Sequence, residues 1–361
     1  MIDIFDIKPK IAVIFGGNSP EYSVSLQSAY AVITHIDKNK YDPVLIGITK
    51  SGEWFRFLGN TDKIANDTWC NTSDCVRAII SPCRSNRSLL EFKANTVHLV
   101  KLDGVMPVLH GRNGEDGTVQ GLLELSGIPI IGCKSLSSSL CMDKEKARKL
   151  AYMAGVQIPK SFLLRKETYG SSDFKQAERL GYPLFVKPVM SGSSLGITKV
   201  MGVNELSEAL NKAFCYDNKV IVEENIPGFE VGCAILGDTD LVIGELDEIE
   251  LSGGFFDYNE KYTLQTSRIH VPARVNAQKT EEIKNAAKTI YHALDCTGFA
   301  RVDMFLTPSG EIVFNEVNTI PGFTNHSCFP NMLYAIGMTF ETVVNRIIGL
   351  ALESAFISCI A

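Results

Sequence analysis

Apolar runs of strand length alternate with amphipathic segments along most of the chain. The first run, KIAVIF, covers residues 10–15, and a glycine turn leads from it into a helical pattern over residues 25–36. Further apolar runs cover residues 41–48, 104–109 and 182–188. Strands that alternate with helices in this way predict a mixed α/β architecture.

The first strand, turn and helix carry a candidate substrate group. The unit resembles the opening of a Rossmann-like domain, but the G-x-G-x-x-G fingerprint is missing after Gly16, so a dinucleotide site has little support. Glu21 lies near the start of the predicted helix, where its carboxylate can bind an ammonium group. A carboxylate that only interacts with the helix dipole is the alternative, and the local sequence leaves both open.

Two regions lack a regular pattern. Residues 50–95 hold two tryptophans and three cysteines among short strand-like runs, and we expect an irregular elaboration of the first domain. Residues 253–262, GGFFDYNEKY, are rich in glycine and aromatic residues, which favours a long functional lid over a core strand. Regular helices are predicted over residues 118–125, from residue 135 through Lys144, and over residues 280–294.

Candidate metal ligands concentrate in residues 301–330. Two alternating runs, 301–306 and 311–317, flank a Pro-Ser-Gly turn and predict a β-hairpin. Alternation places Arg301, Asp303 and Phe305 on one face of the first strand, and Phe314, Glu316 and Asn318 on one face of the second. Three converging oxygen ligands, Asp303, Glu316 and Asn318, suit Mg²⁺, which also binds water and nucleotide phosphates. A solvated sheet face is the alternative for an isolated hairpin.

Two further stretches favour a phosphate and nucleotide site. Lys187 ends a strand that runs straight into a Gly/Ser loop, whose N–H groups can cradle phosphates while Lys144 and Lys187 neutralise them. The Walker sequence is absent, and a flexible hairpin is the alternative. Glu223 and Glu224 end another strand, and we expect one to face a cleft and the other solvent.

His110 follows the predicted strand at residues 104–109, and the glycine-rich stretch HGRNGEDG begins with it. The carboxyl end of a strand is where open parallel sheets bind ligands, so His110 is a candidate site residue. A histidine that is simply hydrogen-bonded in the core is the alternative.

Composition narrows the function class. The chain has 361 residues, of which 45% are hydrophobic and 21% charged, as in a soluble protein of two or three domains. Its net charge of -6 argues against nucleic acid or an anionic membrane as a partner. We expect a cytoplasmic protein, because the N-terminus lacks a signal peptide and no run of 18 apolar residues occurs. The ten cysteines contain no CxxC motif, which disfavours zinc and favours buried thiols.

Taken together, these stretches resemble the D-alanyl-D-alanine ligase family from about residue 10 to residue 350. HGRNGEDGTVQG at residues 110–121 and the block from Arg301 through NEVNTIPGFTNHS look like its two signatures. The resemblance implies an ATP-grasp fold, α/β and α+β, with a Rossmann-like N-terminal domain. The implied domains are residues 1–143, residues 144–230 and residues 231–361, with ATP gripped between the last two.

The resemblance also implies roles for individual residues. The ATP site would comprise Lys144, Lys187, Ser193, Ser194, Glu223, Glu224, Ile226, Glu230, Lys261, Phe305 and Asn315. Asp303, Glu316 and Asn318 would hold Mg²⁺ or Mn²⁺, with two ions expected. Glu21 would bind the first ammonium group in a triad with Ser193 and Tyr262, while Arg301 and the Gly322 backbone stabilise an oxyanion. The remaining substrate contacts would be His110, Phe256, Ser327 and Cys328, with tyrosine in place of Phe256 in many relatives.

The resemblance implies a reaction that joins D-alanine to a second D-amino acid through an acyl phosphate and supplies peptidoglycan precursors. It also implies a homodimer formed through the first domain. Residues 248–264 and 315–327 look most like the VanG type of vancomycin-resistance ligase, which uses D-serine. A housekeeping D-alanine–D-alanine ligase is the alternative. Tyr262 disfavours D-lactate, because depsipeptide-forming relatives have histidine there. Cys328 leaves the acceptor open, because it stands where D-serine users usually have arginine and D-alanine users often have leucine.

Three other functions compete with this reading. Other ATP-grasp carboxylate–amine ligases share the nucleotide grip but lack the HGxxGEDG stretch. A non-catalytic nucleotide or amino-acid sensor is disfavoured because Asp303, Glu316 and Arg301 are all present. A Rossmann dehydrogenase is disfavoured by the missing glycine fingerprint.

Overall fold

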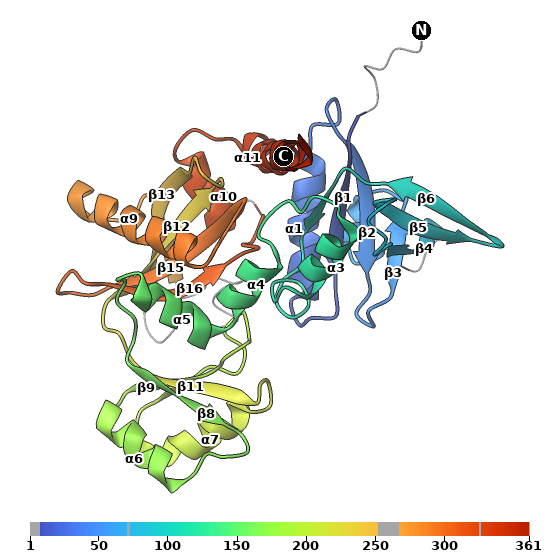
Figure 1. The fold of residues 1–361 in the computed structure, drawn as a ribbon. Coiled ribbons are helices and arrows are strands. Elements are labelled where there is room, and N and C mark those ends of the chain that lie inside the picture. Colours follow the sequence, from blue (N-terminus) through green and yellow to red (C-terminus); the bar gives the residue numbers. More distant parts are fainter. Residues whose placement is uncertain (1–7, 71–72, 252–266, 325, 361) are drawn as a thin grey trace.

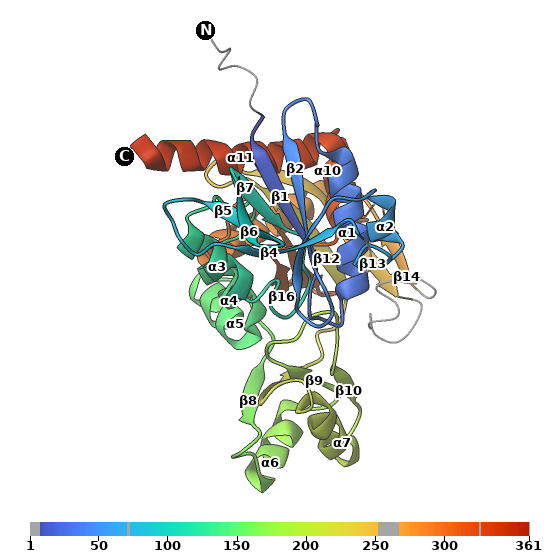
Figure 2. The ribbon, with the colours of Figure 1, turned by 90° about the vertical axis from the view of Figure 1, so that its right-hand side faces the viewer.

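The computed structural model describes residues 8–70, 73–251, 267–324 and 326–360, and three β-sheets organise them (Figure 1). The sheets have seven, four and five strands, in that order along the chain. Figure 2 shows the four-stranded sheet and its helices as a separate lobe below the other two. In the described part of the chain, no helix is long and apolar enough to cross a membrane.

The N-terminal sheet has the strand order β6-β5-β4-β3-β2-β1-β7. Its strands are β1 Lys10–Gly16, β2 Asp42–Ile48, β3 Trp54–Phe57, β4 Cys75–Ile80, β5 Ser88–Lys93, β6 Thr96–Lys101 and β7 Gly104–Pro107. The strand β1, next to the edge strand β7, pairs in parallel with β2 and β7, and its residues Ile11–Gly16 are buried. Burial on both faces explains why its sequence is apolar without alternation.

The expectation that residues 50–95 are irregular is wrong. β3, β4 and β5 lie within this range, and with β6 they extend the parallel core of the sheet by antiparallel pairing. The short helix α2, Asp62–Ala65, also lies here. The strands have only four to six residues each, so polar turns interrupt the alternation before a sequence window can detect it.

The helices beside this sheet include α1, Tyr22–His35, and α3, Thr118–Ser126. The helix predicted from residue 135 is in fact two, α4 Ser135–Met142 and α5 Lys144–Met153. Asp143 separates them, with extended backbone angles and a side chain that accepts a hydrogen bond from the Lys146 N–H at 3.1 Å. Because aspartate caps the second helix, Lys144 becomes its first residue.

The central sheet has the order β10-β9-β11-β8. Its strands are β8 Ser161–Arg165, β9 Leu184–Pro188, β10 Thr198–Val200 and β11 Lys219–Glu224, and its helices are α6 Ser171–Leu180 and α7 Val203–Ala213. Apolar residues from both helices and the sheet form one core, which includes Leu184, Val186, Leu206 and Leu210. The Gly/Ser loop predicted as a phosphate flap connects β9 to β10.

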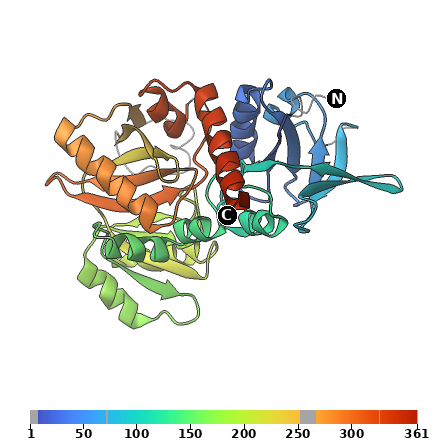
Figure 3. The same ribbon diagram turned by 45° about the horizontal axis from the view of Figure 1, so that its top comes forward.

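The C-terminal sheet has the order β14-β13-β12-β15-β16. Its strands are β12 Phe229–Leu236, β13 Val242–Leu251, β14 Ser267–His270, β15 Phe299–Leu306 and β16 Ile312–Asn318. The helices α9 Ala277–Ala293 and α10 Cys328–Tyr334 pack with it, whereas α11 Phe340–Ile360 contacts α1, α10 and β7. Figure 3 shows α11 between the N-terminal and C-terminal sheets, and a single core joins residues such as Phe15 and Leu26 to Phe329 and Ile347.

Candidate active site

A cavity of about 370 Å³ lies between the central and C-terminal sheets. Eight of its lining residues are ones that the sequence predicts for ATP: Lys187, Ser194, Glu223, Glu224, Ile226, Glu230, Phe305 and Asn315. Glu316, predicted as a metal ligand, lines it as well. Residues separated by more than a hundred positions in sequence are therefore brought to one cavity.

Apart from Ile226 and Phe305, the apolar residues of this cavity were not predicted from the sequence. Phe185, Ile197, Phe229 and Ile249 line it, together with the charged residues Lys199, Glu248, Glu250 and Arg274. Phe185 and Lys187 are two residues apart on β9, so alternation would have placed both on one face. The others come from β10, β12, β13 and neighbouring loops, and nothing in the local sequence marks them.

The predicted hairpin of strands 301–306 and 311–317 forms as β15 and β16, but a β-bulge changes which side chains share a face. Asp303 pairs with Glu316, whereas the next residue, Met304, pairs with Phe314, so Asn315 is the extra residue. Phe314 is consequently buried in the core, and the prediction that it shares a face with Glu316 is wrong. The bulge turns Asn315 toward the cavity, where its Nδ2 donates to Glu230 Oε1 at 3.4 Å.

Glu223 lies in a buried ion cluster. Its Oε1 accepts from Lys187 Nζ at 2.6 Å, and its Oε2 forms an ion pair with Arg148 of α5. Burial raises the pKa of Glu223, but the two cations outweigh burial and hold it below its usual range. Glu224 instead accepts from the Lys160 N–H at 2.7 Å. Both glutamates line the cavity, so the expectation that one of them would face solvent is wrong.

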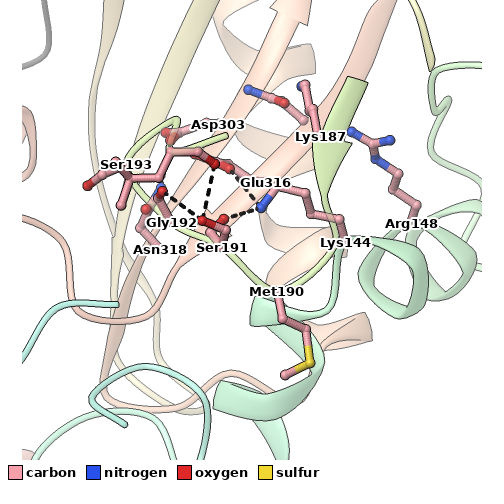
Figure 4. A network of polar contacts seen from close by, with 12 residues as sticks. Lys144, Arg148, Lys187, Met190, Ser191, Gly192, Ser193, Asp303, Glu316 and Asn318 are labelled. Carbon is pink, nitrogen blue, oxygen red and sulfur yellow. Dashed lines mark hydrogen bonds and ion pairs between the residues drawn. The ribbon is translucent and has the colours of Figure 1, made fainter. Parts of the chain in front are cut away.

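Lys144 of α5 contacts the flap between β9 and β10 and lies near Glu316 of β16 (Figure 4). Its Nζ donates to the Ser191 carbonyl at 2.6 Å and lies 4.0 Å from Glu316 Oε2, and its backbone N–H donates to the Val189 carbonyl. The side chain is 7% exposed. A buried cation is therefore held between the flap and the acidic strand β16, where an anionic group can approach it.

Arg301, Asp303 and Asn318 form a compact network. Arg301 Nε and Nη2 each donate to one oxygen of Asp303 at 2.7 Å, and Asn318 Nδ2 donates to Asp303 Oδ2 at 2.7 Å. Strand register sets Arg301 opposite Asn318 and Asp303 opposite Glu316, so the hairpin positions all four side chains. Two carboxylates and one amide oxygen are the hard donors that Mg²⁺ prefers.

Glu21 lies at the N-terminus of α1 and is 6% exposed. The Ser193 hydroxyl of the flap donates a short hydrogen bond to Glu21 Oε1. A Cβ at Gly111 would lie 2.2 Å from Glu21 Oε2, and Gly111 has a φ of +69° that favours glycine, so the residue after His110 leaves room for the carboxylate. The structure therefore places Glu21 of the N-terminal region in hydrogen-bond contact with Ser193 of the flap.

Glu115 is a partly buried acid beside Glu21 that the sequence-based prediction did not include. It accepts from the Gly111 N–H at 2.9 Å and the Ile320 N–H at 3.2 Å, which ties the glycine-rich stretch to the loop after β16. Burial and the negative charge of Glu21 raise the pKa of Glu115 to about 8. The GEDG sequence within residues 110–121 could have drawn attention to it, but its place beside Glu21 is visible only in three dimensions.

His110 is buried, and its Nε2 lies 3.1 Å from the hydroxyl of Ser28. Burial lowers the pKa of His110 to about 4, so its imidazole is neutral near pH 7. A neutral imidazole at this point can exchange hydrogen bonds but cannot provide positive charge.

The loop between β16 and α10 completes the arrangement. A Cβ at Gly322 would lie 2.7 Å from Ser327 Oγ, and this oxygen also lies 2.8 Å from Thr324 Oγ1. Cys328 begins α10, and its thiol is hydrogen-bonded to the buried carboxylate of Asp247 on β13. Asp247 also accepts from the Gly232 N–H at 2.6 Å, and burial raises its pKa to about 6.

Comparison with known proteins agrees with this architecture over nearly the whole chain. Residues 10–133 match the family described as "D-ala D-ala ligase N-terminus", and residues 150–349 match "D-ala D-ala ligase C-terminus". The chain belongs to the D-alanine–D-alanine ligase family. It is an ATP-dependent ligase with the ATP-grasp fold, as the sequence predicted.

Three relatives illustrate the range of this ligase family. The solved structure of the VanG D-Ala:D-Ser ligase from Enterococcus faecalis is 55% identical with a TM-score of 0.89, over 96% of this chain and all 100% of that one. The D-alanine–D-alanine ligase of Caldicellulosiruptor bescii is 41% identical, over 96% of each chain. The vancomycin B-type resistance protein VanB of Enterococcus faecalis is 42% identical, over 96% of this chain and 99% of VanB.

Three predicted residues of the ligase lie outside the described residues: Phe256, Lys261 and Tyr262. The lid predicted at residues 253–262 lies outside them too. The pair formed by Glu21 and Ser193 is thus the described part of the predicted triad.

Proposed function

We propose that this ligase joins D-alanine to D-serine in the synthesis of peptidoglycan precursors, as a vancomycin-resistance enzyme. The observation that carries the choice of acceptor is the contact between Cys328 and the buried Asp247. The relative of known structure that is 55% identical is itself named a D-Ala:D-Ser ligase. The alternative is a housekeeping D-alanine–D-alanine ligase, the name carried by the relative from Caldicellulosiruptor bescii.

In the first step, ATP binds in the cavity between residues 144–230 and residues 231–361. Phe185 and Ile249 provide apolar surface for the adenine, and Glu230 accepts hydrogen bonds from the ribose. Lys144, Lys187 and the flap with Ser193 and Ser194 balance the phosphate charge, together with Lys261. The carboxylate oxygen of D-alanine then attacks the γ-phosphorus, the bond to the β-phosphate oxygen breaks, and an acyl phosphate and ADP result.

The hairpin residues fit a magnesium site. No group of three His, Cys, Asp or Glu side chains among the described residues could hold a metal ion by itself, so Asp303 and Glu316 need further ligands. Asn318 supplies an amide oxygen, and nucleotide phosphates and water supply the rest, as is usual for Mg²⁺. When bound, Mg²⁺ or Mn²⁺ would balance the charge of the phosphates during transfer. Arg301 and Asn318 hold Asp303 in place for this role.

The first substrate binds between α1 and the flap. Glu21 accepts hydrogen bonds from the ammonium group of D-alanine, and Ser193 orients the Glu21 carboxylate by a hydrogen bond. Tyr262 is the third residue of this proposed triad. Glu115 lies next to Glu21 and is protonated near pH 7, because its pKa is about 8. Glu21 therefore faces the ammonium group without a second negative charge that would compete for it.

In the second step, the acceptor amine attacks the acyl carbon and inorganic phosphate leaves. The tetrahedral intermediate carries a negative oxygen, which Arg301 and the Gly322 N–H stabilise. Ser327 binds the acceptor carboxylate, since it lies against Gly322 at the N-terminus of α10. His110 supports this region as a neutral group packed on Ser28.

The acceptor side chain points toward Cys328. A thiol is small, so it leaves room for a hydroxymethyl group, and Asp247 behind it provides a charged acceptor for the serine hydroxyl. The methyl group of a D-alanine acceptor forms no such hydrogen bond. The Asp247 carboxylate would then keep its bonds to Cys328 and Gly232 and gain none from the substrate. This difference favours D-serine over D-alanine.

The test offers the protein D-alanine with equimolar D-serine and D-lactate, ATP and Mg²⁺ at neutral pH and resolves the products by mass spectrometry. We expect D-alanyl-D-serine to dominate, with a minor amount of D-alanyl-D-alanine and no depsipeptide. Dominant D-alanyl-D-alanine would support the housekeeping alternative. Omitting Mg²⁺ or the D-amino acids should abolish phosphate release.

We also propose a homodimer formed through the N-terminal sheet, acting in the cytoplasm. Exposed apolar side chains gather on β4, β5 and β6: Ile79, Phe92, Val97 and Leu99 are 42–57% exposed, and the register of these strands puts them on one face. The nine cysteines whose side chains the structure describes are free thiols, which suits a reducing compartment. Light scattering at micromolar concentration should give a mass near twice that of one chain.

A further inference from the structure

Arg148 occupies a buried position next to the nucleotide cavity. It projects from α5 toward Lys187 of β9, as Figure 4 shows, and it forms an ion pair with Glu223 Oε2. The other oxygen of Glu223 accepts from Lys187 Nζ at 2.6 Å. The side chains of Arg148, Glu223 and Lys187 are 3%, 2% and 9% exposed. Lys187 and Glu223 line the cavity, and Arg148 lies behind them.

The charges of this cluster do not cancel. Two cations share one carboxylate, so the cluster has one net positive charge. If Arg148 were neutral, Glu223 would neutralise Lys187, and the lysine would present little field to an anion in the cavity. Because the cluster is almost free of solvent, the positive charge that Arg148 adds is screened far less than it would be at the surface.

The contact with Glu223 holds Arg148 in position, as an ion pair and a charge-assisted hydrogen bond. The guanidinium nitrogens are buried, and among the described residues they have no hydrogen-bond partner beyond Glu223. A buried guanidinium with so few hydrogen bonds costs free energy. An electrostatic role of Arg148 would explain why the protein buries its guanidinium at this cost in free energy.

We propose that Arg148 is a positioning residue for ATP, which acts by balancing Glu223 so that the charge of Lys187 remains available to the phosphates. This proposal rests on the proposed placement of ATP in the cavity. Arg148 does not touch the nucleotide. Its effect reaches the phosphate groups through Lys187, and it leaves the adenosine part of the nucleotide unaffected.

The experiment compares the binding of ADP and of adenosine by calorimetry in the full-length protein, in the presence of Mg²⁺. Arg148→Met removes the charge and keeps most of the volume, and it should weaken ADP binding about tenfold or more. Adenosine binding should change less than twofold. Arg148→Lys should restore ADP affinity to within about threefold. The matched control is Lys149→Met, which removes an exposed cation paired with Glu145 on the same helix and should change neither affinity.

A second variant separates charge from packing. Arg148→Met combined with Glu223→Gln has one net positive charge again, so ADP affinity should recover toward that of the unmutated protein. If Arg148→Met alone does not fold, the double variant is compared with Glu223→Gln, and it should bind ADP about tenfold more weakly. Equal losses for ADP and adenosine, or no loss for ADP, would overturn the proposal. Failure of the unmutated protein to bind ADP would instead overturn the proposed nucleotide site.

Discussion

Replacement of Asp247 by asparagine tests how this ligase selects its acceptor. Asp247→Asn removes the negative charge but keeps an oxygen that can accept from the Gly232 N–H, now at 2.6 Å, so the fold of β12 and β13 should survive. A hydrogen bond to a charged group contributes about 1.5–3 kcal/mol, and its loss should lower the preference for D-serine over D-alanine roughly tenfold to 150-fold. The use of D-alanine as an acceptor should change little.

The pKa of Asp247 adds a second expectation. Burial raises this pKa to about 6, so the carboxylate is ionised near pH 7.5 and mostly protonated near pH 5. The unmutated protein should therefore lose up to about tenfold of its D-serine preference as the pH falls through 6, and the Asp247→Asn variant should show no such trend.

The assay mixes D-alanine with D-serine and measures the two dipeptides by mass spectrometry from pH 5 to pH 8. Because both products form in the same tube, changes in ATP binding or folding cancel in their ratio. The exposed Asp240→Asn serves as a control and should leave the ratio unchanged. A ratio in Asp247→Asn within twofold of the unmutated value would refute the role of this carboxylate.

Three further changes test the rest of the site. Asp303→Ala or Glu316→Ala should abolish phosphate release, and turnover near the unmutated level would contradict the metal assignment. Arg301→Met should reduce dipeptide formation by at least about a hundredfold while ADP affinity stays within a few-fold, whereas a change confined to the KM for ATP would contradict an oxyanion role. Glu115 has a pKa near 8 in the fold against 4.5 ordinarily, so the folded state binds more protons and stability should fall as pH rises from 4.5 to 8. In thermal melts, Glu115→Gln should flatten the dependence of stability on pH. If the melting temperatures of the two proteins fall in parallel as pH rises, the raised pKa of Glu115 is not the cause.

Local patterns predicted much of this ligase. The strand at residues 10–15, the hairpin with strands at 301–306 and 311–317, and the Gly/Ser loop after Lys187 each depend on contiguous residues, and the structure contains all three elements. Period-two alternation also put Arg301 and Asp303 on one face. These features follow from side-chain periodicity and turn chemistry, which act over a few residues and are therefore readable in the chain.

Other features depended on packing between distant segments. The bulge at Asn315 arises from the pairing of two strands, and the antiparallel strands of residues 50–95 form because an existing sheet edge accepts them. Alternation alone therefore misplaced Phe314, and short runs alone hid β3 to β5. Neither feature has a strong local signal, because both depend on the partner strand.

The sequence by itself determined the residue types of the site, their order along the chain and the local elements that carry them. The tertiary structure decided which charges meet: Arg148 with Glu223 and Lys187, Glu115 with Glu21, and Asp247 with Cys328. The pKa of a group depends on its burial and on neighbours that are far away in sequence. The electrostatics of the ligase therefore exist only in the folded chain, because folding removes these groups from water and brings them within a few ångströms of each other.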